Sequence, residues 1–112
     1  MKPSVQKPQI TVIEGDYGYY LEFTLKDSEG AVIDLGSNSY FFNLQRQGKS
    51  TLNVSARAMT IVSAPAGTCK VLIANGDFNK EGKYYGEVYR NNGGVVQTFE
   101  EIDITCRPQL PR

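Results

Sequence analysis

The chain has 112 residues, with twelve Lys plus Arg against twelve Asp plus Glu, and it contains no histidine. This length accommodates one domain with one ordinary core, and the balanced charge argues against a role that rests on bulk attraction to nucleic acid or anionic lipid. Histidine is the commonest general base and metal ligand, so its absence excludes catalytic triads and His-based metal motifs. We expect no cofactor and no metal site.

Prolines lie close to both ends of the chain. Pro3 and Pro8 precede the regular apolar pattern and Pro108 and Pro111 follow it, so residues 1–8 and 107–112 are predicted to be extended arms around a domain of residues 9–106. No apolar run reaches the roughly 20 residues that cross a bilayer, and no apolar stretch follows the N-terminus as in an export signal. We therefore expect no membrane contact and no secretion.

Apolar residues inside the domain recur at every second position, which predicts strands with one buried face. The clearest strand is residues 19–26, where Leu21 and Phe23 fall on the apolar side and Tyr20 falls on the polar side. The other predicted strands are residues 10–14, a short edge strand at 31–35, and residues 40–46, 57–62, 68–74, 83–90 and 95–105. The strands at 57–62 and 68–74 are expected to pair as a hairpin around Pro65 and Gly67.

Two features are predicted for the last pair of strands. Residues 91–94, Asn-Asn-Gly-Gly, tolerate the positive φ of a tight hairpin turn. The apolar positions change parity in the final strand, which predicts a β-bulge near Glu100 and Glu101. Seven or eight short strands without helical periodicity favour an all-β, immunoglobulin-like antiparallel β-sandwich, with a small closed barrel as the alternative.

The segment 76–89 reads as the corner of such a sandwich. Its Gly82-Lys83-Tyr84 step leads from a turn into a strand, and Tyr84 is expected to fold its hydroxyl back onto the preceding turn. Gly82 and Tyr84 are therefore predicted structural corner residues.

The cysteines and the acidic residues of the turns carry no specific chemical pattern. Cys69 and Cys106 are predicted to be buried thiols rather than a disulfide, because no export signal precedes the domain. The turn acids fit neither an EF-hand nor a specific hydrolase pair, so we expect solvated carboxylates at Asp27, Glu29, Asp77 and Glu81.

Three tyrosines are candidates for an interface. If Tyr84 faces the core, the strand alternation places Tyr85 and Tyr89 outside, as it does Tyr20. Exposed tyrosine is enriched at protein interfaces, although cross-strand aromatic pairs that only stabilise a sheet face are an equal alternative. The arginines are too scattered to predict a basic groove for base stacking, so no nucleic acid is expected.

Four segments together resemble a known family. The runs 10–16, 20–35, 40–44 and 78–88 contain a strand, an Asp-x-x-Gly turn, an aromatic strand and a Gly-x-Tyr corner. This order resembles the immunoglobulin-like N-terminal domain of tailed-phage baseplate upper proteins. The resemblance implies a structural part of the virion, in a phage or prophage, with no catalytic residues to transfer.

The expected function is a non-enzymatic virion structural or assembly module that docks onto other tail proteins or onto itself, assembled in the bacterial cytoplasm. The alternative is a carbohydrate- or receptor-binding module, in which exposed tyrosines and polar residues bind a surface glycan. A carboxylate-based hydrolase is a third, disfavoured possibility, because only Asp, Glu, Lys, Tyr or Cys could supply its acid and base.

Overall fold

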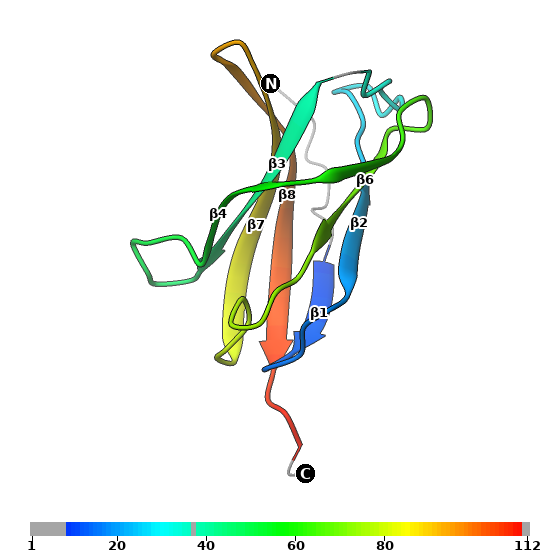
Figure 1. The fold of residues 1–112 in the computed structure, drawn as a ribbon. Coiled ribbons are helices and arrows are strands. Elements are labelled where there is room, and N and C mark those ends of the chain that lie inside the picture. Colours follow the sequence, from blue (N-terminus) through cyan, green and yellow to red (C-terminus); the bar gives the residue numbers. More distant parts are fainter. Residues whose placement is uncertain (1–8, 37, 111–112) are drawn as a thin grey trace.

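The computed structural model describes residues 9–36 and 38–110, in which eight strands form two sheets (Figure 1). The five-stranded sheet has the order β1-β8-β7-β3-β4, and the three-stranded sheet has the order β2-β6-β5. The strands are β1 (Gln9–Ile13), β2 (Tyr20–Thr24), β3 (Ser39–Arg46), β4 (Val54–Ala58), β5 (Thr60–Ser63), β6 (Thr68–Leu72), β7 (Gly82–Asn92) and β8 (Val95–Arg107).

The two sheets pack as an immunoglobulin-like β-sandwich, which confirms the predicted fold class. Every strand pair is antiparallel except β1 with β8, which run parallel and place Ile10 beside Ile104. Alternate residues of both sheets point inward and form one core. Phe23 of β2 and Phe42 of β3 stack across it with ring centroids 6.1 Å apart.

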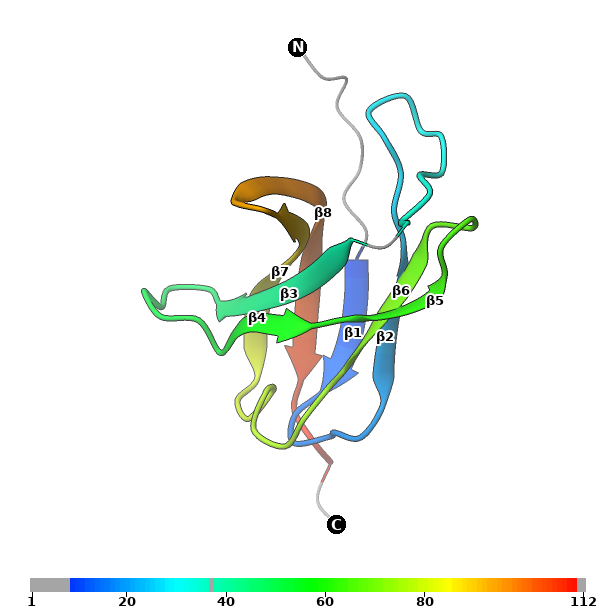
Figure 2. The same ribbon diagram turned by 45° about the horizontal axis from the view of Figure 1, so that its top comes forward.

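The predicted strand at residues 57–62 is in fact two strands in different sheets. β4 pairs with β3, the chain crosses over at Met59, and β5 pairs with β6 (Figure 2). The amide of Met59 still donates to the carbonyl of Tyr40, 2.9 Å away in the first sheet. The predicted hairpin with β6 therefore holds for residues 60–63 only.

The predicted edge strand at residues 31–35 is wrong. This segment makes one isolated bridge, between Lys26 and Val32, and otherwise runs as a loop. Its end is anchored at Leu35, which is fully buried and whose carbonyl accepts a hydrogen bond of 3.2 Å from the Tyr40 hydroxyl. Separate backbone hydrogen bonds, from Asp27 to the Ala31 carbonyl, from Ile33 to the Leu25 carbonyl and from Leu35 to the Ala64 carbonyl, also hold the segment, but they do not form a strand ladder.

The β7–β8 hairpin has both predicted features. Its turn is Gly93 and Gly94, with φ of 60° and 90°, closed by the pair Asn92 and Val95. The register shifts at Phe99, because Val88 pairs with Glu100 and Tyr89 with Thr98. The bulge lies just before its predicted place.

The predicted N-terminal arm, residues 1–8, lies outside the described residues. The predicted C-terminal arm begins too early, because Arg107 is still part of β8 and its carbonyl accepts a hydrogen bond of 2.9 Å from the amide of Glu14. Residues 108–110 follow without regular secondary structure.

Candidate functional site

Strand β7 carries two adjacent tyrosines that face opposite sides of the sheet. Tyr84 is fully buried, and its hydroxyl donates a 2.6 Å hydrogen bond to the carbonyl of Lys80. The ring of Phe78 meets it edge-on at 5.0 Å. This confirms the predicted corner, and burial raises the pKa of Tyr84, which keeps the hydroxyl protonated as a donor.

Gly82 is required where the corner enters β7. Its φ is +133°, and an added Cβ would lie 3.3 Å from Nη2 of Arg46. That same Nη2 donates to the carbonyl of Glu81 at 2.7 Å. A side chain at Gly82 would therefore strain the backbone and push against the arginine that closes the turn.

A partly buried ion pair at the start of the corner segment was not predicted. Asp77 is only 4% exposed, and its carboxylate forms a two-pronged contact with Arg57 of β4, with Nη2 to Oδ1 at 3.1 Å. Oδ2 also accepts the amide of Ala74 at 2.7 Å. The expectation of a solvated carboxylate is wrong for Asp77, because β4 brings a guanidinium over a turn that is distant in sequence.

The other turn acids behave differently. Asp27 remains exposed and caps its own turn, where Oδ1 accepts the amides of Glu29 and Ala31 at 2.9 and 3.0 Å. Asp77 and Asp27 both follow turn patterns in the sequence. They differ because β4 brings Arg57 onto Asp77, whereas the hydrogen bonds that Oδ1 of Asp27 accepts lie within its own turn.

The two cysteines are buried free thiols, as predicted. Burial raises the pKa of Cys69 to about 11 and also raises that of Cys106. A thiol is reactive as its thiolate, so neither is placed for nucleophilic chemistry at neutral pH.

The three predicted interface tyrosines do not form one surface. Tyr20 is half exposed on the three-stranded sheet, with Nζ of Lys70 4.2 Å above its ring. Tyr85 and Tyr89 lie on the five-stranded sheet, and Tyr89 packs against its cross-strand neighbour Phe41 with centroids 5.6 Å apart. Tyr89 therefore fits the alternative of a pair that stabilises the sheet face, whereas Tyr85 remains 45% exposed.

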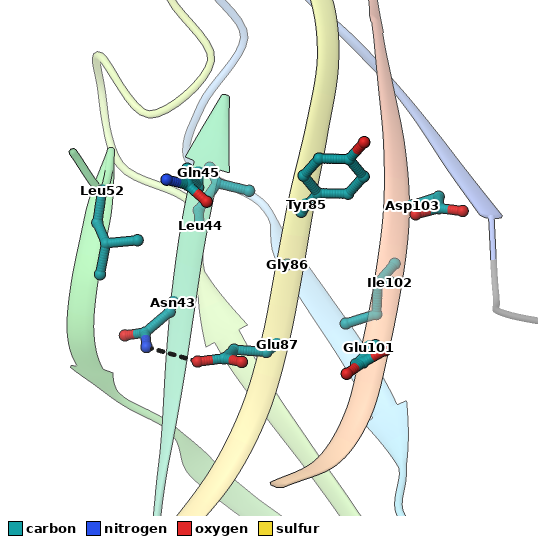
Figure 3. A pocket seen from close by; sticks show the side chains of 10 residues that line it. All are labelled: Asn43, Leu44, Gln45, Leu52, Tyr85, Gly86, Glu87, Glu101, Ile102 and Asp103. Atoms are coloured by element: carbon teal, nitrogen blue, oxygen red, sulfur yellow. Dashed lines mark hydrogen bonds between the residues drawn. The ribbon is translucent and has the colours of Figure 1, made fainter. Parts of the chain in front are cut away.

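Tyr85 borders a hollow of about 300 Å³ on the outer face of the five-stranded sheet (Figure 3). Two cross-strand rows of side chains surround it. The rows are Gln45, Tyr85 and Asp103, and Asn43, Glu87 and Glu101. Leu52, from the loop between β3 and β4, closes one side.

Two polar side chains of this hollow, Asn43 and Glu87, are held in place. Nδ2 of Asn43 donates to Oε1 of Glu87 at 2.9 Å, and Oδ1 of Asn43 accepts the amide of Ala56 at 2.7 Å. Ala56 has a φ of +50°, which L-residues rarely adopt, at a point where the register of β3 and β4 shifts. The strained backbone at Ala56 thus positions the side-chain amide of Asn43, and Asn43 positions the carboxylate of Glu87.

The second exposed feature of this sheet is the turn end of the β7–β8 hairpin. Val95 and Val96 are 67% and 60% exposed there. Both views show this end of the hairpin projecting away from the three-stranded sheet (Figures 1 and 2). Neither valine was singled out from the sequence, because exposure depends on how far the strands extend past their neighbours.

The chain matches no protein-family model and no curated protein sequence. Within the described residues, no group of three or more Cys, Asp or Glu side chains is arranged to hold a metal ion. None of the described residues lies in a helix that is long and apolar enough to cross a membrane.

Proposed function

We propose that this chain is a non-enzymatic structural or assembly module of a phage or prophage tail, which docks onto other tail proteins or onto copies of itself. The observation that carries the docking function is the exposed pair Val95 and Val96 at the end of the β7–β8 hairpin. Successive residues of a strand face opposite sides, so the two valines expose apolar surface on both faces of the projecting hairpin, and a partner that encloses this end would bury both. The tail setting comes from the resemblance of four sequence segments to baseplate domains.

The hairpin is suited to docking because it is ordered before a partner binds. The Gly93-Gly94 turn has the positive φ values of a two-residue hairpin, and Arg90 links the two strands through a 2.7 Å hydrogen bond to Gln97. The guanidinium of Arg90 also lies 5.4 Å from the ring of Phe99. An ordered projection loses less conformational entropy on binding than a loop of the same length.

A second candidate function is the binding of a carbohydrate or receptor. The observation that favours it is the hollow beside Tyr85, where an exposed ring lies among carboxylate and amide groups (Figure 3). Sites for small ligands combine an aromatic surface with a few placed polar groups in this way.

The docking function is tested by incorporation into tail particles. A tagged chain would be produced in an induced lysogen or infected host, and tail particles would be purified by sedimentation and assayed for the tag. We expect the native chain in the particles and the variant with both Val95→Ser and Val96→Ser largely absent from them. Light scattering of the purified chain would show whether a copy of itself is the partner.

The matched control is Val62→Ser, which replaces an exposed valine of β5 in the other sheet. This variant should enter particles as the native chain does. Absence of the native chain from the particles, together with a monomer at high concentration, would contradict the assembly function. Equal incorporation of the hairpin variant and the control would show that the hairpin is not the docking element.

A further inference from the structure

The aromatic ring at the hollow lies flat against the sheet. Figure 3 views the outer face, and the ring of Tyr85 is seen face-on, with its hydroxyl directed away from Glu87. Its cross-strand neighbours are Gln45 on one side and Asp103 on the other. One face of the ring is therefore available to a ligand that approaches from solvent.

The groups around the ring mainly accept hydrogen bonds. Asn43 uses one of its two amide hydrogens on Glu87, and Gln45 uses one of its two on the carbonyl of Lys49 at 2.7 Å, so each keeps a single donor. The carboxylates of Glu87 and Asp103 line the same hollow as the ring. A complementary ligand therefore needs an apolar face for the ring and several hydroxyl donors at its edge.

We propose that this hollow binds a pyranose sugar, with the apolar C–H face of the sugar stacked on Tyr85 and its hydroxyls donating to Glu87 and Asp103. The inference deepens the second candidate function above and is independent of docking through the hairpin. Sugars with mostly equatorial hydroxyls, such as β-glucosides and β-galactosides, present the flattest C–H face and are the expected class.

The size and polarity of the hollow favour a sugar over the apolar side chains of a protein. Its volume of about 300 Å³ is at the lower end for ligand sites, which suits one or two sugar rings. An apolar side chain placed there would remove water from the carboxylates without supplying donors, which is unfavourable. Sugar hydroxyls supply those donors.

The positioned carboxylate strengthens the inference. Glu87 is held by Asn43, and Asn43 is held by the amide of the strained residue Ala56. Backbone strain is stabilised by its surroundings and is concentrated at functional sites. A carboxylate fixed before binding loses little freedom when a hydroxyl donates to it.

The test is a titration of the isotope-labelled full chain with methyl β-glucoside and methyl β-galactoside, followed by NMR, after a glycan array has been screened for longer sugars. We expect the amide signals of Tyr85, Glu87 and Asp103 to shift, and Tyr85→Ala to weaken binding by at least about tenfold. Glu87→Gln should weaken it by a smaller factor, because an amide oxygen still accepts a hydrogen bond.

The control variant is Tyr20→Ala, which removes an equally exposed tyrosine from the other sheet and should leave sugar binding unchanged. Absence of binding both on the array and in the titration would overturn the proposal, as would equal binding by the native chain and Tyr85→Ala. Shifts caused only by N-acetyl-arginine methylamide would assign the hollow to a basic side chain of a protein instead. None of these three results would bear on particle incorporation through the hairpin.

Discussion

Tyr84 and Tyr85 are neighbours in the sequence and belong to two different parts of the molecule. Tyr84 is fully buried, bonds to the Lys80 carbonyl and packs against Phe78. Tyr85 is 45% exposed and borders a hollow. Because strand geometry turns successive side chains to opposite faces, one strand can serve folding on its inner side and recognition on its outer side.

Of the changes that would sharpen this comparison, the largest effect on stability is expected at the partly buried pair of Asp77 and Arg57. Asp77→Ala leaves Arg57 without its carboxylate and the Ala74 amide without its acceptor, so we expect the free energy of unfolding to fall by about 3 kcal/mol. Urea denaturation measures this loss. A loss below about 1 kcal/mol would show that water screens the pair, whose arginine side chain is 30% exposed.

The second-largest effect is expected from alkaline pH, which should lower the free energy of unfolding through groups of the inner region. The pKa of Cys69 is raised from 9.0 to about 11, and that of Tyr19 from 10.0 to about 12, in both cases mainly by burial. The unfolded state therefore loses these protons first, so stability is full below about pH 9 and falls as pH rises toward 12. Thermal unfolding at several pH values checks this. If the stability of a Cys69→Val variant falls with pH as steeply as that of the native chain, Cys69 does not contribute to the pH dependence.

A change of opposite sign is expected at the strained residue on the outer side. Ala56→Gly should raise the free energy of unfolding by up to about 1 kcal/mol, because glycine adopts a φ of +50° without steric strain. Urea denaturation would measure the gain. Ala58→Gly is the matched control, since Ala58 lies in the same strand without a positive φ and should lose stability. If Ala56→Gly and Ala58→Gly both lower the free energy of unfolding, the backbone at Ala56 is not strained.

The smallest stability effect is expected at the exposed tyrosine. Tyr85→Ala should lower the free energy of unfolding by no more than about 1 kcal/mol, because the half-exposed ring packs only on the outer face of the sheet and its removal leaves the core intact. Chemical denaturation beside the native chain would check it. A loss of about 2 kcal/mol would mean that the outer face is a packed layer and not a recognition surface.

The sequence was sufficient for features that depend on local chemistry. The Gly-x-Tyr step predicted the corner, and the paired glycines predicted the hairpin turn. The change of parity predicted a bulge near Glu100 and Glu101, just after its place at Phe99. Each of these depends on backbone preference or on alternation over a few residues. The all-β class followed from the same alternation.

Features that depend on distant strands were beyond the sequence. The pairing of Arg57 with Asp77 requires β4 to cross over the turn before β7, and no spacing in the chain encodes that contact. The crossover at Met59 falls inside one continuous strand-like pattern. Likewise, Tyr20 and Tyr85 share an exposed position in their strands but lie in different sheets.

The most direct test of the separation between the two faces of β7 is one pair of matched variants, Tyr84→Phe and Tyr85→Phe, compared by urea denaturation. Each removes one hydroxyl from adjacent residues. Tyr84→Phe should lower the free energy of unfolding by about 1 kcal/mol, because the Lys80 carbonyl loses its donor, whereas Tyr85→Phe should leave it within about 0.5 kcal/mol. Equal losses in the two variants would contradict the account.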